Sequence, residues 1–98
     1  MTEVRDNKEN NRFEFQIENL TAFVNYEFIM GKLAIQHTEV PQELKGKGIG
    51  SKMVSHILNM AKENGIKIYP FCPFTSGYIK KHPEWMEVVD KGFKWEKT

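Results

Sequence analysis

The hydrophobic pattern of this chain changes its period once, at Pro41. Before it, apolar side chains alternate with polar ones over residues 13–17. They recur as aromatic and β-branched runs over 22–29 and 33–40. A period of two is typical of half-buried strands, so the three runs predict an antiparallel meander. Turns are expected between the runs, at Asn19 and Gly31. Proline cannot donate a ladder hydrogen bond, so the third strand is expected to stop at Pro41.

After Pro41 the apolar residues recur three and four positions apart, which predicts an amphipathic helix over residues 49–64. Its apolar face consists of Ile49, Met53, Val54, Ile57, Leu58 and Ala61. Gly65 stands where a helix favours a left-handed residue after its last turn. A fourth strand is expected over 66–71, parallel to the third, and a short helix over 75–81. The fold class is therefore α+β, with a mixed, mostly antiparallel sheet.

The length of 98 residues suits one domain. Apart from Met1, residues 1–11 hold one apolar side chain, Val4, so a flexible tail is expected there and a single domain over 12–98. Cys72 is the only cysteine, which excludes a disulfide framework and a multi-cysteine zinc site, and no metal is expected. No apolar run is long enough for a membrane span and no secretory signal is evident. A cytoplasmic monomer is expected.

The stretch ELKGKGIGSK, residues 43–52, joins the third strand to the helix. Glycines occupy alternate positions, at Gly46, Gly48 and Gly50, and lysines stand among them, at Lys45, Lys47 and Lys52. Backbone N–H groups of such a turn and of a helix N-terminus bind anions. The spacing fits neither the nucleoside-triphosphate pattern nor the dinucleotide pattern, because Ser51 stands where each requires glycine. The stretch therefore predicts a phosphate or pyrophosphate site of another kind.

The distribution of charge supports an anion site. The whole chain carries a net charge of +1, yet residues 45–82 contain seven lysines and one acidic residue, Glu63. A locally basic surface attracts anions although the total is near zero.

Cys72 directly follows the predicted fourth strand, where reacting groups often lie in open sheets. A thiol becomes nucleophilic when a base or a positive field lowers its pKa. His37, on the third strand, is a candidate base, and Glu39 is expected on the same strand face. Tyr78 is a candidate proton donor. Packing roles are the alternative for each of them, and Trp85 and Trp95 are interpreted as packing residues.

The order of these segments resembles the GNAT superfamily of N-acetyltransferases. Its pyrophosphate signature, [Q/R]-x-x-G-x-[G/A], reads KGKGIG over residues 45–50, with Lys45 in place of Arg or Gln. The segments QHTEVP (36–41) and FCPF (71–74), followed by Tyr78 and His82-Pro83, look like the short, single-domain branch. The resemblance covers roughly residues 12–85. The chain is too short for the N-terminal helices that shape the acceptor pocket in larger members.

The resemblance implies an acetyl-CoA site between the third and fourth strands. Expected cofactor-binding residues are Thr38, Val40, Lys45, Gly46, Lys47, Gly48, Ile49, Gly50, Ser51, Lys52, Cys72, Phe74, Tyr78 and Lys81. In the short branch the residues matching His37 and Cys72 are the proposed catalytic pair. Typical members use a strand carboxylate and a tyrosine, for which Glu39 and Tyr78 are the matching candidates. The acceptor is an amine of unidentified class.

The sequence predicts an acetyl-CoA-dependent N-acetyltransferase, with transfer either direct or through an acetyl-Cys72 intermediate. One alternative is a non-catalytic CoA-binding or interaction module with the same fold. Another is a small nucleic-acid-binding domain that uses the lysine-rich face. The latter is disfavoured because that face lacks interleaved aromatic residues. The terminal residues, 86–98, carry no motif that indicates a function.

Overall fold

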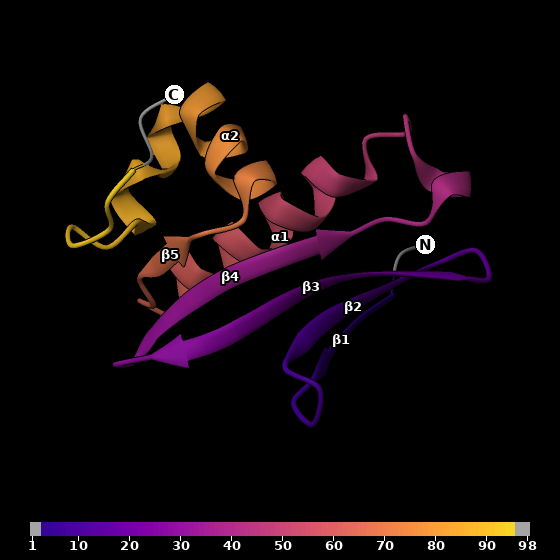
Figure 1. Cartoon of the computed structure of the whole chain (residues 1–98), viewed down its shortest axis with the longest axis horizontal. Helices are drawn as coiled ribbons and strands as arrows, with labels where there is room; N and C mark the ends of the chain where they lie inside the picture. The colour runs from indigo at the N-terminus through magenta and orange to yellow at the C-terminus, as the bar shows by residue number, and fades with distance from the viewer. Residues whose placement is uncertain (1–2, 96–98) are drawn as a thin grey trace.

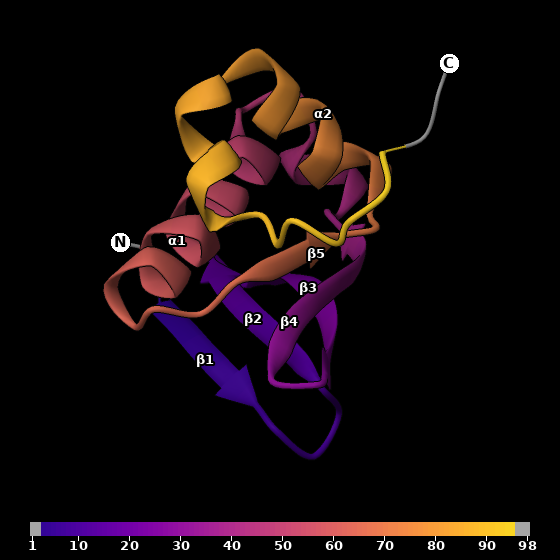
Figure 2. The same cartoon turned by 90° about the vertical axis from the view of Figure 1, so that its left-hand side faces the viewer.

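The computed structural model describes residues 3–95 and contains one five-stranded sheet with its helices on one face (Figures 1 and 2). The elements are β1 (Glu3–Asn7), β2 (Arg12–Ile17), β3 (Leu20–Ile29), β4 (Lys32–Glu39), η1 (Gln42–Leu44), α1 (Ile49–Glu63), β5 (Ile68–Pro70), α2 (Pro73–Lys81) and η2 (Pro83–Val88). The strands lie side by side in chain order. Neighbouring strands from β1 to β4 are antiparallel, and β4 and β5 are parallel. The predicted α+β class with a mixed, mostly antiparallel sheet is confirmed.

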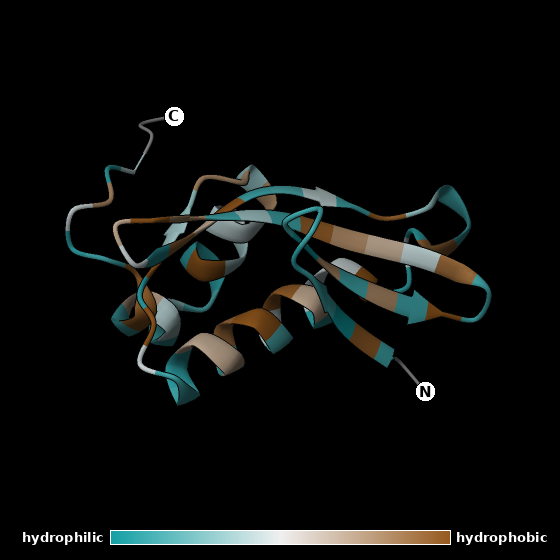
Figure 3. Ribbon diagram, turned by 90° about the horizontal axis from the view of Figure 1, so that it is seen from below, coloured by the Kyte–Doolittle hydropathy of each residue, from teal (hydrophilic) through white to brown (hydrophobic). Residues whose placement is uncertain are grey.

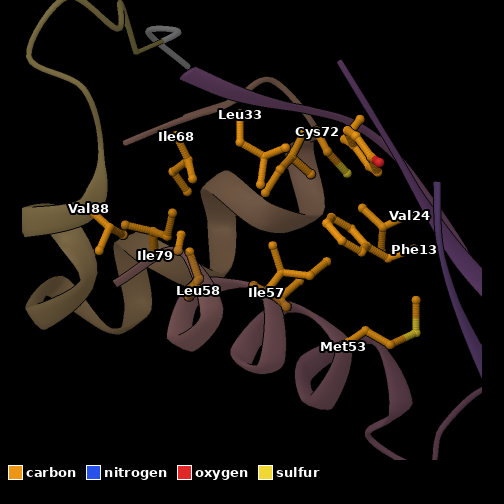
Figure 4. Packing of buried hydrophobic residues seen from close by; sticks show 14 of the residues in the cluster. Phe13, Val24, Leu33, Met53, Ile57, Leu58, Ile68, Cys72, Ile79 and Val88 are labelled. Carbon is orange, nitrogen blue, oxygen red and sulfur yellow. The ribbon is translucent and has the colours of Figure 1, made fainter. Parts of the chain in front are cut away.

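The core lies between the sheet and α1. Alternation in β2 and β3 sends Phe13, Phe15, Ala22 and Val24 to the same buried face of the sheet. The predicted apolar face of α1 packs against this face of the sheet. Its buried residues are Met53, Val54, Ile57, Leu58 and Ala61. Figure 4 shows Met53, Ile57 and Leu58 facing the sheet, and Figure 3 shows the apolar side of α1 turned the same way. The sequence period therefore identified the contact surface of both layers.

The prediction of a flexible tail over residues 1–11 is wrong for the described part of that segment. Residues 3–7 form β1, which pairs with β2 along its whole length. The Tyr26 hydroxyl donates a hydrogen bond of 2.5 Å to Asp6 and joins β1 to β3. An edge strand is stabilised by ladder hydrogen bonds and needs few apolar side chains. Hydrophobic content is therefore a poor guide to this strand.

The chain beyond Trp85, which carries no sequence motif, packs back against β5. η2 continues into a single bridge between Val89 and Ile68, and the Asp90 N–H donates to the Ile68 carbonyl at 2.9 Å. Val88 and Val89 are buried. This segment covers the edge of β5 and carries the chain to Phe93 and Trp95, which pack against the core as partly buried residues. The interpretation of Trp85 and Trp95 as packing residues is confirmed in this sense.

In residues 3–95 no helix is long and apolar enough to cross a membrane.

Candidate functional site

β4 and β5 separate halfway along β4. They are paired from Leu33 with Ile68 to Ile35 with Pro70, and the Cys72 N–H donates to the Ile35 carbonyl at 2.9 Å. On its other side β4 pairs with β3, where the register shifts so that Gln36 is an extra residue. Such a bulge bends its strand and increases its twist. Beyond Ile35, β4 runs on to Glu39 away from β5, and the two strands open into a V.

A cleft of about 400 Å³ lies at this opening. Its walls are the last residues of β4, the loop after η1, the first turn of α1 and the start of α2: Thr38, Glu39, Val40, Leu44, Lys45, Gly46, Gly48, Ile49, Gly50, Ser51 and Phe74. Figure 1 shows the end of β4, the loop that follows it and the beginning of α1 on the right-hand side of the molecule. A cleft of this size suits part of a small-molecule ligand. The strand ends and the glycine loop therefore form one site.

The first turn of α1 has the features of an anion-binding site. Gly48 is its N-cap, with a φ of +74° and no capping side chain, and the first turn has no acidic residue. The first hydrogen bond within the helix is donated by Lys52 to the Gly48 carbonyl. The N–H groups of Ile49, Gly50 and Ser51 therefore have no partner inside the helix. These donors, the helix dipole and the exposed Lys45 favour a bound phosphate group.

Gly50 allows the beginnings of α1 and α2 to approach closely. A Cβ at this position would lie 2.7 Å from Cζ of the Phe74 ring, which is closer than carbon atoms pack. The Phe74 ring forms a wall of the cleft and is 46% exposed. The third glycine of the loop is therefore needed for contact with α2, a role that spacing did not indicate.

Cys72 lies at the N-cap of α2, and its side chain belongs to the buried core. Its sulfur is 3.3 Å from Thr38 Oγ1. Burial raises the pKa of the Cys72 thiol. The Thr38 hydroxyl and the first backbone N–H groups of α2, on Thr75 and Phe74, oppose that effect, and the pKa lies below the ordinary value. These hydrogen bonds favour the thiolate relative to an ordinary cysteine, in a residue that is only 4% exposed.

His37 and Glu39 lie on the face of the sheet opposite to the helices, as their register with Asn25 and Phe23 shows. His37 Nε2 lies 2.9 Å from Glu39 Oε2, and the side chains are 60% and 56% exposed. The expectation that the two share a strand face is confirmed. Among residues 3–95 no hydrogen bond joins His37 to Cys72; the structure pairs Cys72 with Thr38 instead.

Five of the residues expected to bind the cofactor lie outside the lining of this cleft. Lys47, Lys52 and Lys81 are exposed. Tyr78 stacks on His82 with ring centroids 4.4 Å apart and borders a shallow depression with Ser51 and Ser55. Cys72, the fifth, lies behind the cleft lining in the core.

Leu44 also lines the cleft, although it is not among the residues expected to bind the cofactor. It is 1% exposed and anchors η1 beneath the glycine loop. Leu44 is a single apolar residue between Glu43 and Lys45, and this isolated position in a polar segment indicates a buried side chain.

Comparisons with known proteins agree with this geometry. The model of the GCN5-related N-acetyl-transferase family matches residues 12–88. Protein NATD1 of Gallus gallus is 30% identical over 63 residues, which are 63% of this chain and 57% of that protein. NATD1 of Danio rerio is 27% identical over 71 residues, which are 69% of this chain and 64% of that protein. The chain thus spans less than two thirds of these relatives.

A solved structure is also similar. It is the NMR solution structure of a protein from Staphylococcus aureus described as a GCN5-like putative N-acetyltransferase. The TM-score is 0.70 and the sequence identity 28%, and the match covers 90% of this chain and 87% of the other. The fold and the sequence comparisons therefore point to one family.

Proposed function

The chain belongs to the GCN5-related N-acetyltransferase family, and from this premise we propose that it transfers the acetyl group of acetyl-CoA directly to an amine. The observation that carries the proposal is the cleft in the V between β4 and β5. It joins an anion-binding helix N-terminus to a carboxylate, Glu39, that is hydrogen-bonded to His37.

The residues of the cleft suit coenzyme A. Its pyrophosphate is an anion for the N–H groups of Ile49, Gly50 and Ser51, with Lys45 adding positive charge. Its pantetheine arm carries amides, which suit the last part of β4, from Thr38 to Val40, where the strand has left β5. Bound acetyl-CoA supplies the thioester.

Glu39 is the proposed base. Glu39 is one of the residues that line the cleft. The hydrogen bond from His37 orients its carboxylate on the face of the sheet opposite to the helices. An alkyl ammonium must lose a proton before its nitrogen can attack, and Glu39, alone or with His37, accepts that proton. The neutral nitrogen then attacks the thioester carbonyl, and the bond from carbon to sulfur breaks. Coenzyme A leaves as a thiolate, which takes up the second proton that the nitrogen loses as the amide forms. Tyr78, which lies outside the cleft lining, has no step in this proposal.

A covalent route is a second candidate, favoured by the environment of Cys72. In that route the Cys72 thiolate attacks the acetyl carbonyl and coenzyme A leaves, and an amine then takes the acetyl group from the sulfur. Thr38 and the first turn of α2 stabilise the thiolate without His37. The groups that stabilise the Cys72 thiolate are therefore Thr38 and the first turn of α2, whereas the family resemblance implied His37.

Single-turnover mass spectrometry separates the two routes. With acetyl-CoA and no amine, the direct route predicts no acetyl adduct on Cys72, and turnover that survives Cys72→Ala. An adduct that forms and decays on addition of amine, and is lost in Cys72→Ala together with turnover, supports the covalent route instead.

The base is tested with Glu39→Gln, and with His37→Gln as its partner variant. A positioned base contributes about 10²–10⁴-fold, so Glu39→Gln is expected to lower kcat by that order and leave the Kd of coenzyme A unchanged. Full activity of Glu39→Gln across the pH range would contradict the assignment.

The acceptor is sought with a library of amines and radiolabelled acetyl-CoA. Sustained transfer to any amine supports the enzyme. Tight coenzyme A binding without transfer to any amine identifies the non-catalytic binding module.

A further inference from the structure

A second groove, of about 330 Å³, lies on the side of α2 that faces away from α1. Its lining comes from the end of β5, one face of α2 and the C-terminal segment: Pro70, Phe71, Pro73, Ser76, Gly77, Lys80, Phe93, Lys94 and Trp95. Figure 2 shows the C-terminal segment, in yellow, running beside β5 below α2. None of these residues lines the cleft assigned to coenzyme A.

The helix α2 separates the two sites through the directions of its side chains. Thr75 and Ile79 point into the core, and Phe74 contacts the first turn of α1 at Gly50. The remaining face carries Ser76, Gly77 and Lys80 and lines the groove. Residues three and four apart share a helix face, so this division follows from the helical repeat.

Three aromatic rings form one side of the groove. The ring centroids of Phe71 and Phe93 are 5.5 Å apart, and those of Phe93 and Trp95 are 5.0 Å apart, both edge to face. Phe71 is 55% exposed although it adjoins buried Cys72. An exposed ring beside two others provides a surface on which a planar ligand can stack.

Gly77 forms the opposite side and has no packing reason to be glycine. It lies inside α2, and a Cβ added to it would meet no atom within 4 Å. Glycine within a helix is less favourable than alanine by about 1 kcal/mol. Because Gly77 has no side chain and faces open space, a ligand in the groove can approach the helix backbone at this position.

The charge of the lining is positive. Lys80 Nζ lies 5.8 Å from the centroid of the Trp95 ring, and Lys94 is also a lining residue. Within residues 3–95 the lining contains no acidic residue. The Lys80 ammonium beside an aromatic ring, with Lys94 as a second lysine of the lining, favours a ligand that is both planar and anionic.

We propose that this groove is a second ligand site, separate from the coenzyme A cleft, that binds an aromatic anion. The ring of the ligand lies against Phe71 and Trp95, above the backbone of Gly77, and its carboxylate or phosphate faces Lys80 and Lys94. The proposal rests on the groove and its charge and does not require the chain to be catalytic.

The test is an NMR titration of the full chain with indole-3-acetate, with the neutral indole-3-acetamide as the matched ligand. Shifts are expected at the Gly77 amide and the Trp95 indole N–H, with the acid binding about fivefold more tightly than the amide. Lys80→Gln and Lys94→Gln are each expected to weaken the binding of indole-3-acetate about threefold, because a partly exposed charge contributes little to affinity. Lys91→Gln, an exposed lysine of the same segment outside the groove, is the control and leaves the affinity unchanged.

Gly77→Ala separates a ligand site from a structural role. It is expected to raise Tm by about 4–8 °C, because it removes a helix-interior glycine. It is also expected to weaken the binding of indole-3-acetate by about tenfold or more, because the added methyl group occupies the space of the ligand's ring. A variant of unchanged affinity, equal binding of acid and amide, or no shift at millimolar acid would each overturn the proposal. Coenzyme A that shifts the same Gly77 and Trp95 signals would also overturn it, since the groove would then belong to the cofactor.

Discussion

Replacing Gly48 with alanine tests whether the glycine loop is set by backbone conformation. Gly48 has a φ of +74°, and an added Cβ would meet no atom within 4 Å, so the substitution causes no clash. An L-residue in the left-handed region costs about 1–2 kcal/mol. Gly48→Ala is therefore expected to lower the free energy of unfolding by that amount.

Gly77→Ala is the matched control for this prediction. Its added Cβ also meets no atom within 4 Å, but Gly77 has helical backbone, where alanine is better than glycine by about 1 kcal/mol. The same chemical change is therefore expected to destabilise at Gly48 and stabilise at Gly77, with a difference of about 2–3 kcal/mol between the variants.

Urea unfolding followed by circular dichroism measures this difference. With an m-value of about 1–3 kcal/mol/M, the two midpoints are expected to differ by about 1 M or more, on either side of the unsubstituted chain. Gly48→Asn is expected to cost less than Gly48→Ala, since asparagine tolerates a positive φ. Equal shifts in the same direction for the two alanine variants, or an asparagine variant as unstable as the alanine one, would refute the reasoning.

Further predictions concern four other positions. Leu44→Ala is expected to cost about 2–5 kcal/mol in thermal or urea unfolding, because the side chain is almost fully buried, whereas a cost below about 1 kcal/mol would show that η1 is not anchored there. Tyr26→Phe removes the hydrogen bond to Asp6 and should cost about 1 kcal/mol and speed hydrogen exchange in β1, and unchanged exchange would contradict this link. Burial and that hydrogen bond raise the pKa of Tyr26 to about 12, so its contribution is complete below its unfolded pKa, about 10, and is lost as pH rises through 12. Thr38→Val should raise the pKa of Cys72, seen as an alkylation profile displaced to higher pH, and His37→Gln should not move it. Because the folded state lowers the pKa of Cys72, the chain should gain stability relative to Cys72→Ala as pH rises from the folded pKa toward about 8.5, and a flat difference would oppose this.

Elements with a strong local period could be predicted from the sequence. The strands β2, β3 and β4 follow the predicted runs, and α1 spans Ile49–Glu63 against a prediction of 49–64. The turns at Asn19 and Gly31 and the helix α2 before Pro83 also agree. Each depends on residues close in sequence, whose alternation or helical spacing determines which side chains can be buried together.

The strand β1 could not be predicted in this way. Four of its five residues are exposed, and hydrogen bonds to β2, rather than apolar side chains, join it to the sheet. Backbone donors and acceptors are the same in every residue except proline, so a polar strand leaves no mark in the hydrophobic pattern.

The residues of the candidate site also fall into two groups, those close together in sequence and those far apart. The glycine loop and its lysines were visible because they are contiguous, and alternation along β4 predicted that His37 and Glu39 share a face. Nothing in the sequence showed that Cys72 would face Thr38, since the two residues are 34 positions apart. Their contact depends on where β5 ends against β4.

The sequence by itself determined the order of the strands and helices from β2 to α2, the conformationally permissive loop at Gly48 and the basic character of the segment around it. These follow from backbone sterics, side-chain period and charge, which act between near neighbours. Only the tertiary structure decided which face of β4 meets Cys72, and that Phe93 and Trp95 return to Phe71 beside α2. Those contacts join residues distant in the chain, and their energy comes from packing that exists only once the sheet and helices have assembled.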